Sequence, residues 1–170
     1  PPAAMGDDST VVDRASASLS WPVLMVLREA EVPFLVGGGY AFVRYTGIDR
    51  PLKDFDIFLR ERDYPGAAEA LPVAGIETAV PFPHWLAKAN RGDEFVDIIY
   101  GSGNGVAPVD DDWFRHARRD DRLGVVLDLV PPEEMIWTKS FVMERERFDG
   151  ADVVHLIRQR AHDLDWSRLL

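Results

Sequence analysis

Two aspartates one residue apart, Asp54 and Asp56, interrupt the run "LKDFDIFL" at residues 52–59, whose other residues are apolar except for Lys53. The apolar residues from Phe55 to Leu59 predict a short β-strand. Side chains at positions i and i+2 of a strand point to the same face, so the two carboxylates are expected to project together. Bare carboxylates side by side repel each other, and a divalent cation removes that repulsion. The run therefore predicts a strand whose two acids lie close enough to share a cation.

A turn of three glycines lies shortly upstream, in "FLVGGGYAF" at residues 34–42. Residues 32–36 predict a short apolar strand, residues 37–39 a sharp turn, and residues 40–45 the first turns of a helix. Backbone N–H groups at such a helix start bind phosphate. Each feature alone also has an ordinary structural explanation, because glycines serve tight turns and Asp54 could cap a loop.

A third acid, Asp97, stands among apolar residues in "EFVDIIYG" at residues 94–101. Mg²⁺ prefers hard oxygen ligands and commonly takes a few carboxylates together with substrate phosphates. Three acids that converge from neighbouring strands would form a two-metal site, which clamps the attacking and leaving oxygens of a phosphoryl displacement. The sequence therefore names Asp54, Asp56 and Asp97 as candidate metal ligands.

The rest of the chain alternates between helix and strand patterns, which predicts an α+β fold. We expect a mixed, mostly antiparallel sheet of about four or five strands flanked by helices, with a C-terminal helical hairpin. Residues 1–130 would form the core with an N-terminal helix, and residues 131–170 a helical extension packed on the same domain. The expected elements are a helix over 11–30, a helix that ends at Gly75, strands near 84–89 and 95–100, a glycine-rich loop over 101–112, a short helix over 109–118, a strand within 122–132, and helices over 131–148 and 150–164.

Composition limits the partners of this chain. Its 170 residues include no cysteine, which excludes disulfides and thiolate metal sites, and its formal net charge is −10. A chain of that charge is expected to repel long nucleic acids, whereas a nucleoside triphosphate can bind through divalent cations. The sequence contains no apolar run long enough to cross a bilayer, and its start lacks the pattern of a signal peptide. We therefore expect a cytoplasmic protein with no membrane partner.

The order of these features resembles the nucleotidyltransferase superfamily of polymerase β type, over roughly residues 32–100. Gly38 and Gly39 match its GG signature, and the acids match its DxD pair and third acid. The chain is similar in more detail to small bacterial proteins related to AbiEii-type toxins. Those proteins often read GG-x-A and then R-x-T-x-D-h-D-h, where h is apolar. Ala41 and Arg50 fit this pattern, and the helical tail also looks similar.

This resemblance implies transfer of a nucleoside monophosphate from an NTP, such as ATP, to a hydroxyl acceptor, with Mg²⁺ or Mn²⁺ as cofactor. Asp54 and Asp56 would bind the metals, and Asp97 would complete the second metal site and help deprotonate the acceptor. Gly38 and Gly39 would hold the triphosphate through backbone N–H groups. Leu52 departs from the pattern, because many relatives carry Thr or Ser at this position.

Two positively charged side chains are candidates to bind the triphosphate. Arg50 could neutralise it, or could be a solvated loop charge. Lys139 could reach the phosphates across a cleft, or could lie along an apolar helix face with its amine in water. Tyr40 or Trp137 could supply the apolar shelf that a nucleotide base needs.

The sequence leaves three functions open. The first is the nucleotidyltransferase. The second is a catalytically inactive binding or regulatory module on the same fold, such as a toxin–antitoxin component with a protein partner. A metal-dependent phosphohydrolase has less support, because no histidine cluster or HD pair is present. For a transferase, the acceptor is a small hydroxylated molecule, a protein side chain or an RNA end.

Overall fold

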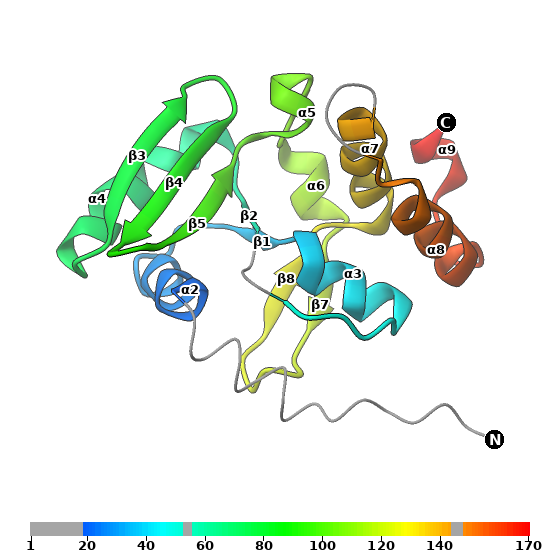
Figure 1. The fold of residues 1–170 in the computed structure, drawn as a ribbon, viewed down its shortest axis with the longest axis horizontal. Coiled ribbons are helices and arrows are strands. Elements are labelled where there is room, and N and C mark those ends of the chain that lie inside the picture. Colours follow the sequence, from blue (N-terminus) through cyan, green and yellow to red (C-terminus); the bar gives the residue numbers. More distant parts are fainter. Residues whose placement is uncertain (1–18, 53–55, 144–147) are drawn as a thin grey trace.

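The computed structural model describes residues 19–52, 56–143 and 148–170. Within these residues one mixed sheet has seven strands, in the order β3-β4-β5-β2-β1-β8-β7 (Figure 1). The α+β fold class is confirmed, and the expected count of four or five strands is too low. The strands of this sheet are β1 (Leu35–Val36), β2 (Ile57–Phe58), β3 (Glu77–Phe82), β4 (Leu86–Arg91), β5 (Glu94–Ile99), β7 (Arg118–Asp120) and β8 (Leu127–Leu129).

Helices surround this sheet, and most of them lie where the sequence pattern predicts, whereas the short helices at residues 102–105 and 166–169 were not expected. Residues 101–112, expected to be a loop, contain a short helix and the strand β6 (Ala107–Pro108), which pairs back on residues 101 and 102 through isolated bridges. The helices are α2 (Ser20–Glu29), α3 (Gly38–Thr46), the 3-10 helix η1 (Glu61–Asp63), α4 (Tyr64–Val73), α5 (Ser102–Gly105), α6 (Asp111–Arg115), α7 (Pro132–Met143), α8 (Gly150–Arg160) and α9 (Trp166–Leu169).

Two strands of only two residues form the middle of the sheet. β1 is followed by the glycine turn, and β2 begins directly after Asp56. β1 pairs antiparallel with β2 and parallel with β8, and β2 pairs parallel with β5. The register places Ile57 beside Ile98 and Phe58 beside Ile99. Because the strands are parallel, the residues just before these pairs, Asp56 and Asp97, are also neighbours across the sheet.

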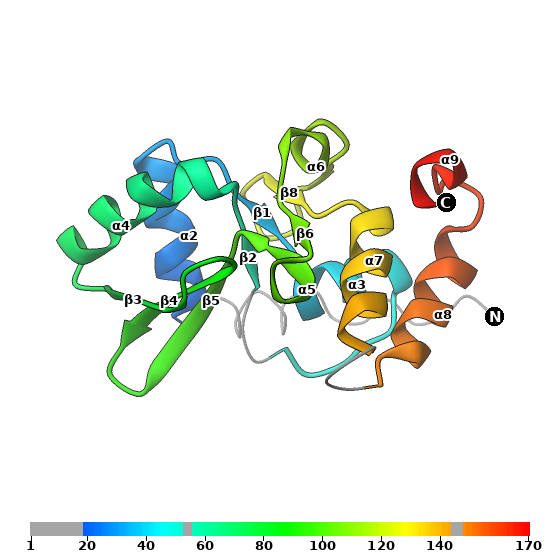
Figure 2. The ribbon, with the colours of Figure 1, turned by 90° about the horizontal axis from the view of Figure 1, so that it is seen from above.

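Strand β5 shows the alternation that decides which face carries the site. Val96 and Ile98 are buried, whereas Asp97 and Ile99 between and after them are partly exposed. The buried face lies against α2 and α4, which cover one side of the β3–β4–β5 part of the sheet (Figure 2). Consequently, Asp97 points to the opposite face, which these two helices leave uncovered.

Local signals in the sequence account for several element ends. The Asp110 carboxylate accepts hydrogen bonds from the backbone N–H groups of Asp112 and Trp113, which caps α6 at its N-terminus. Gly92 has a φ of +61° in the turn between β4 and β5, where a left-handed residue is needed. The predicted hairpin is therefore confirmed, although its outer strand β3 was not expected.

The C-terminal helices pack against one another and against α3, at the end of the sheet opposite β3 (Figure 1). The carboxylates of Glu133 and Glu134, at the start of α7, are buried and form ion pairs with Arg168 of α9. Burial raises the pKa of Glu134, and the charge of Arg168 opposes that rise. The Trp137 indole N–H also donates to the Leu169 carbonyl at 3.2 Å, so the last helix is held on α7.

No helix in the described part of the chain is long and apolar enough to cross a bilayer.

Candidate active site

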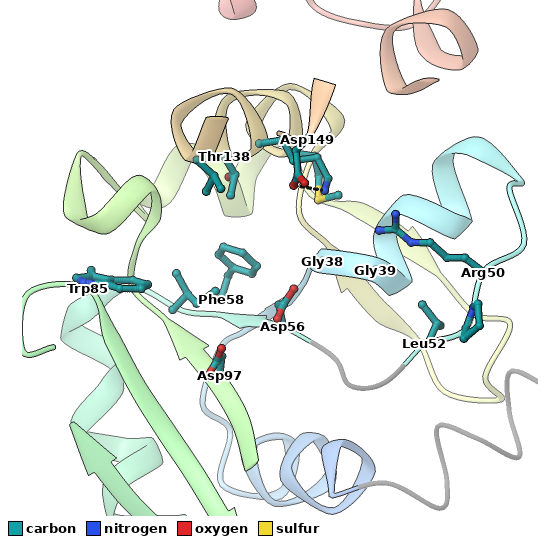
Figure 3. A pocket seen from close by; sticks show the side chains of 15 residues that line it. Gly38, Gly39, Arg50, Leu52, Asp56, Phe58, Trp85, Asp97, Thr138 and Asp149 are labelled. Atoms are coloured by element: carbon teal, nitrogen blue, oxygen red, sulfur yellow. Dashed lines mark hydrogen bonds and ion pairs between the residues drawn. The ribbon is translucent and has the colours of Figure 1, made fainter. Parts of the chain in front are cut away.

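One pocket of about 500 Å³ lies between the start of α3, the strands β2 and β5, and the helix α7 (Figure 3). Six of the seven residues that the sequence predicts for the site line it: Gly38, Gly39, Arg50, Asp56, Asp97 and Lys139. The seventh, Asp54, lies outside the described residues. Residues from four separate parts of the chain therefore meet at one cavity.

The two described acids of the predicted triad stand side by side. Asp56 precedes β2 and Asp97 lies within β5, at equivalent positions of two parallel-paired strands. Phe58 and Ile99, two residues further along each strand, also line the pocket, so both acids point to the pocket face. Figure 3 shows the Asp56 carboxylate directed toward the start of α3, with Asp97 on the neighbouring strand.

The glycine turn brings the helix start into contact with the first of these acids. Gly38 is the first residue of α3 and has a φ of +55°, a conformation that favours glycine. A Cβ at this position would overlap the Asp56 carboxylate oxygen Oδ2. The backbone N–H of Gly37 donates to the Asp56 carbonyl at 2.9 Å, which fixes the turn to the strand. The absence of a side chain at Gly38 therefore lets a carboxylate lie at the positive end of the helix dipole.

The neighbouring glycine faces the residue that departs from the family pattern. A Cβ at Gly39 would lie 3.0 Å from the Leu52 side chain, which is tighter than an ordinary contact. Leu52 lines the pocket, so this wall of the cavity is apolar where a hydroxyl was expected from the resemblance.

An ion pair that the sequence analysis did not identify joins Asp97 to the next strand. Lys88 of β4 lies directly opposite Asp97 in the antiparallel register, and its Nζ donates to Asp97 Oδ1 at 2.6 Å. The same Nζ lies 3.9 Å from the centroid of the Phe95 ring. The pair follows from the observed turn at residues 92 and 93, because Lys88 and Asp97 are each four residues from it.

A second charged group closes the pocket on the side of the helical tail. Lys139 of α7 forms ion pairs with Asp149 at 3.1 Å and with Asp152 at 2.7 Å. Arg50 also bonds Asp152 at 3.0 Å, and its guanidinium carbon lies 4.1 Å from the centroid of the Phe42 ring. Burial alone would raise the pKa of Asp152, but hydrogen bonds from Lys139 and Arg50 outweigh it and hold the pKa below the ordinary value. Both predicted phosphate ligands are therefore tied to α8.

Aromatic side chains reach the pocket from unexpected positions. Tyr40 is buried in the core, where its hydroxyl donates to Asp120 at 2.5 Å, and neither Tyr40 nor Trp137 lines the cavity. The expectation that one of them forms a shelf is wrong. Trp85 and Phe58 line the pocket instead, and Trp85 lies at the end opposite Arg50 (Figure 3).

The donor set of the described residues fits a divalent cation only in part. No group of three His, Cys, Asp or Glu side chains with metal-binding geometry occurs in residues 19–52, 56–143 and 148–170. The two neighbouring carboxylates of Asp56 and Asp97 nevertheless offer hard oxygen ligands at one edge of the cavity. Such a pair suits Mg²⁺ or Mn²⁺ when phosphate and water supply the other ligands.

No protein-family model and no curated protein matches this sequence. Solved structures do match. The antibiotic-resistance factor ANT(2'')-Ia is 16% identical with a TM-score of 0.59, covering 89% of this chain and 85% of that one. The same protein in complex with adenylyl-2''-tobramycin is 15% identical with a TM-score of 0.58, covering 88% and 87%. The lincosamide antibiotic adenylyltransferase LnuA, bound to lincomycin, is 15% identical with a TM-score of 0.57, covering 80% and 92%.

These likenesses show that the chain has the nucleotidyltransferase fold. They agree with the polymerase β-type fold that the motifs predict. The closer resemblance to AbiEii-type proteins stays a prediction.

Proposed function

We propose that this protein is a nucleotidyltransferase that moves a nucleoside monophosphate from an NTP to a hydroxyl group of a small molecule. One observation carries the proposal. Asp56 and Asp97 lie side by side at the start of α3, in a pocket that also contains Arg50 and Lys139. Acids beside a phosphate-binding helix start are what nucleotidyl transfer requires.

The proposed step is an in-line displacement at the α-phosphorus of the NTP. A bond forms between the acceptor oxygen and this phosphorus, while the bond from the phosphorus to the oxygen of the pyrophosphate breaks. Pyrophosphate leaves with that electron pair, and the proton of the acceptor hydroxyl passes to the Asp97 carboxylate. Asp97 suits this role because it lies on the pocket face of β5, beside Asp56.

Mg²⁺ or Mn²⁺ would be held at Asp56, with Asp54 as the further ligand that the sequence motif implies and Asp97 beside Asp56 on the neighbouring strand. When bound, the cation neutralises charge on the phosphates and on the leaving pyrophosphate. The protein's own contribution is geometric, because the contact between Gly38 and Asp56 sets how far the carboxylate lies from the helix start.

The triphosphate is proposed to lie along the start of α3, within reach of Arg50 and Lys139. The N–H groups at Gly38 and Gly39 belong to the first turn of the helix, where backbone donors have no partner within the helix. Arg50 and Lys139 both line the pocket while they pair with Asp152. When a nucleotide is bound, these two side chains would contact both Asp152 and the phosphates, and their positive charge would offset the negative charge of the nucleotide.

A small hydroxylated acceptor is supported by the structural neighbours, which act on antibiotics. We propose that it enters at the Trp85 end of the cavity, opposite Arg50 (Figure 3). Trp85 and the partly exposed Asp97 both line the cavity, so a molecule packed against Trp85 could extend a hydroxyl group toward the proposed base. Trp85 supplies an apolar wall for the body of such a molecule.

Calorimetric titration of Mg·ATP tests the nucleotide part of the proposal. We expect binding to the wild type that requires the cation and is lost in Asp56→Asn. Asp93→Asn is the matched control, because it makes the same substitution at an exposed residue of the β4–β5 turn. Equal binding by all three proteins would contradict the proposal.

A second candidate is a module that binds the nucleotide without transferring it. Leu52 in the pocket wall and the lysine bound to Asp97 favour this alternative. The two are separated by incubating the protein with α-labelled ATP and a panel of hydroxylated small molecules. Label on an acceptor, together with released pyrophosphate, supports the transferase; binding without either product supports the module.

A further inference from the structure

Lys88 contacts both Asp97, the proposed base, and the ring of Phe95. Its strand position is fixed by the β4–β5 register, which pairs it directly with Asp97. Its Nζ donates to Asp97 Oδ1 at 2.6 Å and lies 3.9 Å from the centroid of the Phe95 ring. Cross-strand opposite charges and cation–π contacts both stabilise such an arrangement. The ammonium is thus a fixed feature of this edge of the site.

Arg50 and Lys139, the two cationic side chains that line the pocket in the described part of the chain, have different partners. Arg50 and Lys139 are paired with Asp152, and Lys139 also with Asp149, all on the side of the helical tail. Lys88 reaches the site from the sheet side, where its ion pair is with Asp97. The cations on the side of the helical tail and the lysine on the sheet side are therefore held by separate carboxylates.

An ammonium and a divalent cation compete for the same carboxylate. Lysine carries a compact, strongly hydrated charge with three donors, and it already occupies Oδ1 of Asp97. A cation bound to that carboxylate would lie a few ångströms from the ammonium, where two positive charges repel strongly. The ammonium therefore opposes a second cation at Asp97. Asp56 lies against the start of α3 at Gly38, where the triphosphate and the cation that it carries are proposed to bind.

We propose that Lys88 takes the place of the second divalent cation of the site, an inference that rests on the proposed function. The site then holds one Mg²⁺ or Mn²⁺, carried by the nucleotide at Asp56, while Lys88 supplies the positive charge beside Asp97. In this arrangement Lys88 is a positioning residue that keeps the Asp97 carboxylate directed at the acceptor side. It also sets how many cations the protein binds, which differs from the two-metal site that the sequence predicts.

The number of bound Mn²⁺ ions tests this inference without any measurement of activity. Electron paramagnetic resonance counts free Mn²⁺ during titration of the protein with α,β-methylene-ATP present. We expect one tightly bound ion per wild-type chain. Lys88→Met keeps the length of the side chain and removes its charge. We expect it to bind a second ion up to about fivefold more tightly than the wild type, since a partly exposed ion pair contributes up to about 1 kcal/mol.

Two variants serve as controls. Lys88→Arg keeps the positive charge and should bind one ion, like the wild type. Arg91→Met removes one charge from an exposed residue further along the same strand, so it reports the general effect of net charge. Circular dichroism of each variant shows that the fold is retained.

The outcomes separate this inference from the proposed function. A second Mn²⁺ in Lys88→Met, absent from Lys88→Arg and Arg91→Met, supports the role of Lys88. Two ions in the wild type, or no gain in Lys88→Met, overturns it even when nucleotide binds normally. The proposed function is judged separately, by whether Asp56→Asn abolishes nucleotide binding.

Discussion

Gly38→Ala is expected to reduce nucleotide binding much more than it reduces the stability of the fold. Gly38 has a φ of +55°, and a Cβ there would overlap the Asp56 carboxylate. A left-handed conformation costs an alanine about 1–2 kcal/mol. The Asp56 side chain must also rotate away, which moves the carboxylate from the helix start. We expect a modest loss of stability together with a large loss of nucleotide binding.

Gly47→Ala is the matched control for this substitution. Gly47 ends the same helix with a φ of +69°, and nothing lies within 4 Å of the position its Cβ would take. The backbone penalty is therefore the same, without any contact with the site. For a chain of this size, about 1–2 kcal/mol corresponds to a fall of roughly 2–8 °C in the melting temperature of either variant.

Nucleotide binding then distinguishes the two variants. Losing one well-placed charged contact costs about 1.5–3 kcal/mol, so the Kd of Gly38→Ala for Mg·ATP should rise at least about tenfold. Gly47→Ala should bind like the wild type. Calorimetry at a temperature where both variants remain folded measures this difference. If Gly38→Ala binds Mg·ATP as tightly as Gly47→Ala, the contact with Asp56 has no part in binding.

Two further predictions concern stability. The pKa of Asp152 is held below its ordinary value of 3.8, so its carboxylate stabilises the folded state above that pH and loses this effect as the pH falls through the lower folded-state value. Denaturant unfolding of the wild type and Asp152→Asn should therefore give free energies that converge below about pH 3.8, and a constant difference would contradict this. Tyr40→Phe removes the partly buried hydrogen bond to Asp120 and should lower the free energy of unfolding by about 1 kcal/mol without changing the Kd for Mg·ATP; a change in that Kd would show that Tyr40 contributes to the site.

The centre of the fold was predictable because its local signals agree with one another. Apolar runs flank the glycine turn, and the acids interrupt the following strands at fixed spacing. Strand β3 was missed because nearly all of its side chains are exposed, which leaves no alternating pattern. Strand β7 was missed because it reads "RRD", a run of charges with no apolar residue.

The site was predictable to the extent that it depends on a local motif. The GG and Asp-x-Asp patterns identified the pocket, and one of the two acids of the pair is described in it. Asp152 could not be assigned, because it lies 102 residues from Arg50 and only packing brings the two together. The pairing of Lys88 with Asp97 required the hairpin register in addition to the motif.

A crystal structure with Mn²⁺ and α,β-methylene-ATP tests the central claim most directly, because the anomalous signal locates the ion independently of the protein atoms. We predict an Mn²⁺ ion in contact with an Asp56 carboxylate oxygen, and phosphate oxygens against the backbone N–H groups at the start of α3. Nucleotide bound elsewhere on the protein, or an ion that does not touch Asp56, would contradict the account.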